Sequence, residues 1–74
     1  MKLFVLKVEI HHSADCVDKD HFYYLGLEAA KRFAKRQYYI DSWVRIDSNG
    51  NLQASTTDDG TPVTCTIYLE ETMD

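Results

Sequence analysis

The chain has 74 residues, of which 45% are hydrophobic and 27% are charged, and its formal net charge is −4 at pH 7. This length allows one small domain, here expected to span residues 1–74, and the apolar content excludes a disordered chain. The acidic balance argues against direct binding to nucleic acid, because phosphate recognition needs a net or segregated positive surface.

The first apolar run, LFVL at residues 3–6, is interrupted by Lys7 and Glu9. It is too short for the core of a signal peptide or for a membrane span of about 20 residues. Two cysteines, Cys16 and Cys65, are too few for a disulfide framework. These features predict a cytoplasmic protein with reduced thiols and no association with membranes.

Two strands are predicted at the start of the chain. Residues 2–12 alternate with the period of a β-strand, and the face expected to be buried comprises Phe4, Leu6, Val8 and Ile10. The aspartate-rich segment 13–20 breaks this pattern and predicts a turn. The aromatic segment 22–25 then favours a second strand, which would complete a hairpin.

A helix is predicted within LGLEAAKRFAKRQYY, residues 25–39, because apolar residues recur at spacings of three and four; they are Leu27, Ala30, Phe33, Ala34 and Tyr38. Gly26 is the expected N-cap. Glu28 in the first turn and basic residues toward the other end suit the helix dipole.

Three more strands are predicted, at residues 42–46, 51–56 and 63–71. The Asn49-Gly50 pair indicates a tight hairpin between the first two. A three-residue loop closed by Gly50 in the left-handed conformation is favoured, because its register pairs apolar residues with each other, Ile46 with Leu52 and Val44 with Ala54.

The predicted fold is therefore α+β, with the order ββαβββ and one helix on one face of an antiparallel sheet. The core should combine the helix stripe with Phe4, Leu6, Val8, Ile10, Val44, Ile46, Cys65, Ile67 and Leu69. The alternation leaves a group of aromatic, aliphatic and basic residues on the helix-free face. Such side chains are enriched at protein interfaces, so we predict a partner-binding site comprising Trp43, Arg45, Tyr68, Tyr23 and Val5.

The segment EIHHSADCVDKDH, residues 9–21, contains every histidine of the chain. His12, Cys16 and His21, with Cys65 or an aspartate as a fourth ligand, have the donor types that zinc prefers. The usual paired-ligand spacings are absent, and His11 and His12 would point to opposite faces of a strand. A solvated turn is the better interpretation, so we predict no metal and no cofactor.

No catalytic residue is predicted, because a cysteine nucleophile would need an adjacent base and an oxyanion site, and the chain has no phosphate-binding loop. Half of the basic residues lie on the predicted helix, namely Lys31, Arg32, Lys35 and Arg36. They are either the solvated back of an amphipathic helix or a patch for an acidic partner or for phosphates.

The layout as a whole, with the opening MKLFVLKVEI, the LEAAKRFAKR helix, the SWVRI strand and the acidic YLEETMD end, resembles small phage-encoded accessory proteins such as the anti-CRISPR group. That resemblance implies a non-enzymatic protein that occupies a functional surface of a host enzyme or defence complex in the host cytoplasm. The alternative is a metal-stabilised or nucleic-acid-associated regulator that uses the His/Cys cluster or the basic helix. A homodimer through the helix-free face also fits the pattern.

Overall fold

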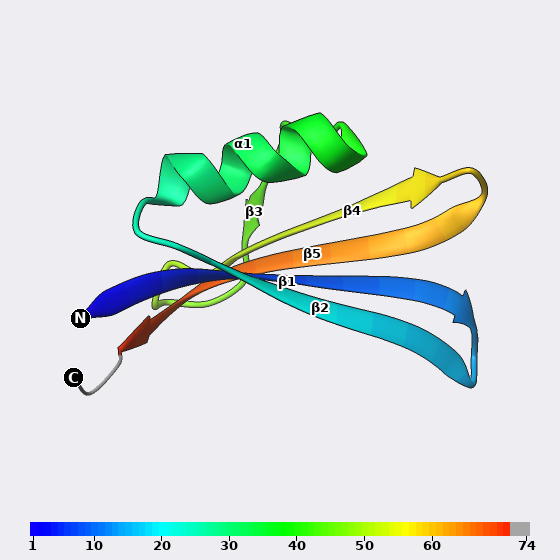
Figure 1. Ribbon diagram of the computed structural model, residues 1–74, viewed down its shortest axis with the longest axis horizontal. Coiled ribbons are helices and arrows are strands. Elements are labelled where there is room, and N and C mark those ends of the chain that lie inside the picture. The colour runs from blue at the N-terminus through cyan, green and yellow to red at the C-terminus, as the bar shows by residue number, and fades with distance from the viewer. Residues whose placement is uncertain (72–74) are drawn as a thin grey trace.

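The computed structural model describes residues 1–71, which form a five-stranded antiparallel sheet with one helix across a single face (Figure 1). The order of strands in the sheet is β2-β1-β5-β4-β3. The elements are β1 (Lys2–Ser13), β2 (Cys16–Tyr24), α1 (Leu27–Tyr38), β3 (Val44–Arg45), β4 (Leu52–Asp58) and β5 (Thr61–Glu71). This arrangement confirms the predicted α+β fold and the ββαβββ order. The last three residues of the YLEETMD segment lie outside the described part of the chain.

The core lies between α1 and the face of the sheet that carries the even-numbered residues of β1. Leu6, Val8, Cys65 and Ile67 are fully or almost fully buried there, as the strand alternation predicted. Phe4 and Ile10 pack against this cluster and are partly buried. Leu69, by contrast, is 46% exposed, because β5 extends past the main cluster toward the end of the sheet.

Two alanines allow the helix to approach the sheet closely. Ala30 and Ala34 are both completely buried, one turn apart on the same side of α1. Larger side chains fill the space at the edge of this contact, where the ring of Phe33 lies 4.8 Å from that of Phe22 and 6.2 Å from that of Tyr24. An isolated helix of 12 residues is only marginally stable in water. Burial of the apolar stripe of α1 against the sheet therefore supplies most of the stability of the helix.

Both ends of the helix are defined by backbone geometry. Gly26 is the N-cap, as predicted, and its carbonyl oxygen accepts a bond from Ala30. At the other end Tyr39 adopts the left-handed conformation, with φ 60°, and its N–H donates to the Lys35 oxygen. The next residue, Ile40, is only 5% exposed, so an apolar anchor directs the following segment along the helix.

The hairpin between β1 and β2 is tighter than predicted. Ser13 pairs with Cys16, so the turn comprises only Ala14 and Asp15, and the predicted turn over residues 13–20 is wrong beyond them. The polar segment 16–20 is strand because its backbone satisfies the hydrogen-bonding groups of the long β1. Its side chains are exposed at the sheet edge, where charge is tolerated and discourages further strand pairing.

The predicted register of the β3–β4 hairpin is also wrong, by one residue. Val44 pairs with Gln53 and Arg45 with Leu52, and the Ile46 N–H donates to the Asn51 oxygen at 2.9 Å. The loop therefore has four residues, 47–50, in place of three. Gly50 does adopt the predicted left-handed conformation, with φ 86°.

The side chain of Asp47 explains the longer loop. Its carboxylate accepts hydrogen bonds from the backbone N–H of Asn49 at 2.9 Å and from that of Asn51 at 3.2 Å. The Asn51 side-chain amide donates a third bond at 2.7 Å. This local capping compensates for the loss of apolar pairing that the three-residue loop would have given.

Candidate binding surfaces

The helix-free face has a row of three side chains across its central strands. Tyr23 in β2 pairs with Val5 in β1, and Val5 pairs on its other side with Tyr68 in β5. Tyr23 is 59% exposed and Tyr68 is half-buried. Val5 is 0% exposed, so it cannot contact a partner directly, which corrects its predicted role. It instead supports the two rings from below.

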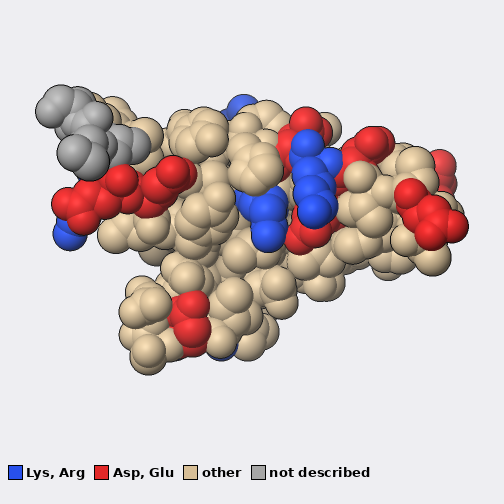
Figure 2. All heavy atoms as spheres, turned by 90° about the horizontal axis from the view of Figure 1, so that it is seen from below, with Lys and Arg blue, Asp and Glu red and all other residues tan. Residues whose placement is uncertain are grey.

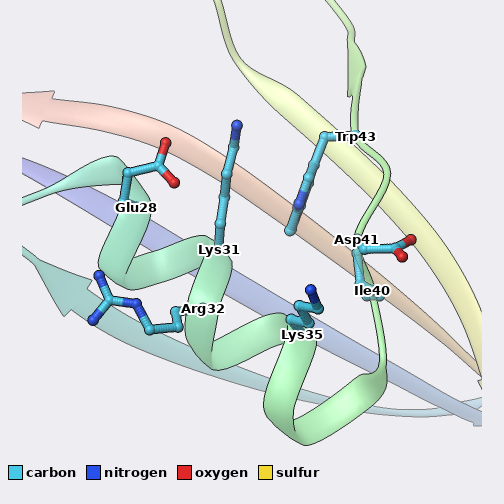
Figure 3. Close-up of a pocket in the computed structure, with 7 residues that line it drawn as sticks. All are labelled: Glu28, Lys31, Arg32, Lys35, Ile40, Asp41 and Trp43. Carbon is cyan, nitrogen blue, oxygen red and sulfur yellow. The ribbon is translucent and has the colours of Figure 1, made fainter.

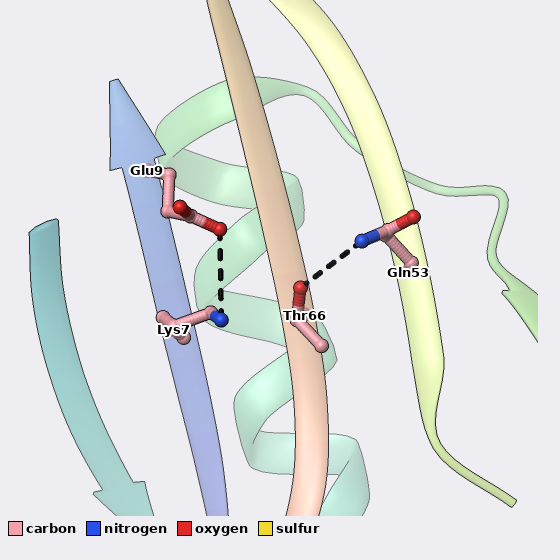
Figure 4. A network of polar contacts seen from close by, with 4 residues as sticks. All are labelled: Lys7, Glu9, Gln53 and Thr66. Atoms are coloured by element: carbon pink, nitrogen blue, oxygen red, sulfur yellow. Dashed lines mark hydrogen bonds and ion pairs between the residues drawn. The ribbon is translucent and has the colours of Figure 1, made fainter. Parts of the chain in front are cut away.

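The one-residue register shift adds aliphatic side chains to this face. Gln53 and Thr66 lie on the side of the sheet opposite the helix, together with Lys7 (Figure 4). Because Val44 pairs with Gln53, it shares that face, and Ile46 continues its alternation. Val44 and Ile46 are 66% and 47% exposed, so their predicted place in the core is wrong.

We call this surface the helix-free band, and we define it by its four accessible members, Tyr23, Tyr68, Val44 and Ile46. The two tyrosines were predicted here from strand alternation. The two aliphatic residues were missed, because the apolar pairing rule assigned them to the opposite face. The signal that could have placed them is Asp47, whose carboxylate can cap a four-residue loop.

The polar residues beside the helix-free band include one ion pair and one hydrogen bond between side chains. Lys7 forms an ion pair with Glu9 at 3.6 Å, and Gln53 donates a long hydrogen bond of 3.5 Å to the hydroxyl of Thr66 (Figure 4). Seen from below, acidic side chains gather toward both ends of the molecule, and basic side chains lie near its middle beside uncharged surface (Figure 2). The face thus has acidic ends, and its middle combines uncharged surface with a few basic side chains.

The phenol of Tyr68 titrates above its ordinary range. Burial, the nearby Glu70 carboxylate and the Tyr23 phenol all raise its pKa, with burial the largest cause. The ring of Tyr68 therefore stays protonated at neutral pH and can donate a hydrogen bond to a partner.

Trp43 and Arg45 lie on the other side of the sheet from the one predicted. Arg45 pairs with Leu52, and Leu52 pairs with the core residue Ile67. The shifted register therefore places the side chains of Trp43 and Arg45 on the helix side of the sheet. Trp43 is half-buried and packs against the core cluster. The predicted grouping of Trp43 and Arg45 with Tyr23 and Tyr68 is therefore wrong.

Trp43 lines a groove between α1 and the segment that follows it (Figure 3). The groove has a volume of about 240 Å³. Figure 3 shows the indole opposite the side chain of Lys31, with Lys35 one turn farther along the helix. The full lining comprises Glu28, Lys31, Arg32, Lys35, Ile40, Asp41 and Trp43.

The histidine and cysteine residues do not gather at one point. His12 contacts Asp18, with 2.8 Å between Nε2 and a carboxylate oxygen, at the exposed end of the β1–β2 hairpin. Cys16 is exposed, whereas Cys65 lies in the core, and burial raises the pKa of its thiol to about 11. Across residues 1–71, no three His, Cys, Asp or Glu side chains are placed to hold a metal ion together.

The one helix within residues 1–71, α1, lacks the length and apolar character needed to cross a membrane. The chain matches no protein-family model, no curated protein and no solved structure. The candidate surfaces therefore rest on the geometry of this chain alone.

Proposed function

We propose that this protein is a non-enzymatic binding module that docks on a partner protein through the helix-free band. The observation that carries the proposal is the exposure of apolar side chains on one side of the sheet, with Tyr23 at 59%, Val44 at 66% and Ile46 at 47%. Polar residues such as Asn51 and Gln53 lie between the two tyrosines and the two aliphatic residues, and exposed apolar and aromatic side chains gathered on one sheet face mark a candidate interaction surface. Tyrosine is also among the residues enriched at the energetic centres of interfaces.

Charge indicates the kind of partner. The chain has a net charge of −4, and acidic side chains lie toward both ends of this face (Figure 2). A second copy would bring the same acidic ends toward each other, whereas a basic surface with an apolar centre would complement them. We therefore assign the helix-free band to a different protein with a basic rim, in preference to a homodimer.

A module of this size can inhibit a larger enzyme or complex by occupying part of its surface, without catalysing a reaction. The sequence layout, which resembles that of phage-encoded inhibitors, supports a host enzyme or defence complex in the cytoplasm as the target. Basic surfaces of nucleic-acid-processing enzymes have the charge that this face would complement.

Site-specific photocross-linking in lysate of the native host tests this proposal. A photoreactive phenylalanine analogue replaces Val44, and a control protein has it at Gln37, an exposed position on α1. The proposal predicts one dominant adduct from position 44, absent from position 37, with a basic protein that has an apolar patch at the cross-linked site. Equal labelling from both positions, or an adduct only with a second copy of the chain, would contradict it.

A further inference from the structure

The groove beside Trp43 combines an aromatic wall with an excess of positive charge. Its lining includes three cations, Lys31, Arg32 and Lys35, against two carboxylates, Glu28 and Asp41. Within residues 1–71, none of these three cations lies within ion-pair distance of a carboxylate, although Glu28 is only one turn from Lys31 and Arg32. In this part of the chain the three cations are thus unpaired, and the lining has one more cation than carboxylates.

The position of the indole is fixed by the fold. Ile40 is 5% exposed and anchors the chain after the left-handed residue Tyr39, so the segment to Trp43 runs alongside the helix. Trp43 packs against the core with one part and lines the groove with another. Figure 3 shows Lys31 and Trp43 on facing sides of this opening. A ligand in the groove would thus meet an aromatic surface and lysine cations together.

We propose that this groove binds an acidic peptide segment of a partner protein, in which a carboxylate side chain lies next to an apolar or aromatic one. The carboxylate would contact Lys31 and Lys35, and the neighbouring side chain would pack on the indole. This site lies on the helix side of the sheet and does not depend on the proposed function of the helix-free band.

Size and charge favour a peptide over a nucleotide or a nucleic acid. The volume of about 240 Å³ is below the range of roughly 300 to 1,000 Å³ that is usual for small-molecule pockets, so it suits one or two side chains. Glu28 and Asp41 in the lining would repel a long chain of phosphates. The lining has a net excess of one positive charge, three cations against two carboxylates, which matches a ligand of small charge.

Trp43 is the only tryptophan of the chain, so its fluorescence reports directly on this groove. The probe is the acetylated and amidated pentapeptide Gly-Asp-Phe-Glu-Gly, and its control replaces the two acidic residues by asparagine and glutamine. Saturable change in the emission is expected with the acidic peptide only. Adenosine monophosphate, inorganic phosphate and a short oligothymidine form separate arms of the titration.

Charge-reversal variants test whether the acidic peptide binds in this groove. Lys31→Glu is expected to weaken binding of the acidic peptide about tenfold, which is about 1.4 kcal/mol. Arg36→Glu is the matched control, since Arg36 lies on the same helix but outside the lining, and it should leave the affinity within about twofold of the wild type. Circular dichroism establishes that both variants keep the helix.

Three results with the peptides would overturn the assignment. These are no response to the acidic peptide, an equal response to its neutral control, and an equal loss of affinity in Arg36→Glu. A saturable response to adenosine monophosphate or oligothymidine in place of the peptide would also overturn it, since it would identify a phosphate ligand.

Discussion

Tyr23 and Tyr68 lie on opposite sides of Val5 in one row across three adjacent strands, and the valine between them is completely buried. The helix-free face thus has a buried aliphatic support beneath two accessible rings. This support matters because rings that are fixed before binding lose less conformational entropy on association.

Val5→Ala is expected to lower the free energy of unfolding by about 2 kcal/mol, because it removes buried methyl groups and leaves a cavity between the two rings. Val44→Ala, at a position that is 66% exposed, should change it by less than about 0.5 kcal/mol. Urea unfolding followed by circular dichroism measures both. An unchanged midpoint for Val5→Ala would show that Val5 does not support the face.

Ala34→Leu is expected to destabilise the protein by about 1 to 3 kcal/mol, since a larger side chain would push the helix away from the sheet. Ala34 is 0% exposed and lies where α1 meets the core. Gln37→Leu, on the exposed side of the same helix, is the control for helix propensity. If the two variants unfold at the same temperature, Ala34 does not lie at a close contact between helix and sheet.

Stability should depend on the ionisation of Asp47. Desolvation alone would raise the pKa of this carboxyl, but hydrogen bonds from Asn51, Asn49 and Gly50 outweigh it and lower the pKa below 3.8. A folded-state pKa that is depressed contributes stability above the unfolded value, and this contribution is lost as pH falls through the folded value. The wild type should therefore be more stable than Asp47→Ala at about pH 7, and the difference should shrink below about pH 3.8.

Urea unfolding of both proteins across this pH range measures the effect, and Asp41→Ala serves as a control for loss of an exposed carboxylate. A difference between wild type and Asp47→Ala that is the same at both ends of the pH range would mean that the carboxylate does not hold the loop.

The two thiols should differ in reactivity. Cys16 is exposed, whereas Cys65 is 0% exposed and burial raises the pKa of its thiol to about 11. At about pH 8 an aromatic disulfide reagent should modify one thiol rapidly, because only an accessible thiolate attacks it. Cys16→Ser should abolish the fast reaction, and urea should expose the second thiol. Rapid modification of both thiols in the native protein would contradict the burial of Cys65.

Strand alternation and helical periodicity predict most of this fold. The even-numbered residues of β1 and the stripe of α1 lie where their patterns place them, because burial on one face imposes those periods. The hairpin turns were less predictable, since side chains that cap the backbone compete with apolar pairing. Asp47 extends one loop to four residues, and the single-residue shift reverses the faces of every residue from Trp43 to Ile46.

The candidate site was predictable only in part for the same reason. Tyr23 and Tyr68 belong to long strands whose register is fixed by many pairs, so their face follows from sequence. Trp43 and Arg45 belong to a two-residue strand whose register depends on one turn. The polar segment of β2 was missed because an edge strand in solvent has no apolar alternation to identify it.

The most direct test of the helix-free band is the dissociation constant of its partner, once that partner has been identified by cross-linking and purified. The double variant Tyr23→Ala/Val44→Ser is predicted to weaken binding at least about tenfold, or about 1.4 kcal/mol, while it stays folded at the assay temperature, although loss of the Tyr23 ring partly uncovers Val5. Tyr39→Asn removes a tyrosine that is 88% exposed at the end of the helix and keeps a residue type tolerant of the left-handed conformation. Its affinity should equal that of the wild type. Unchanged affinity in the double variant, or an equal loss in Tyr39→Asn, would contradict the assignment of the helix-free band as the docking surface.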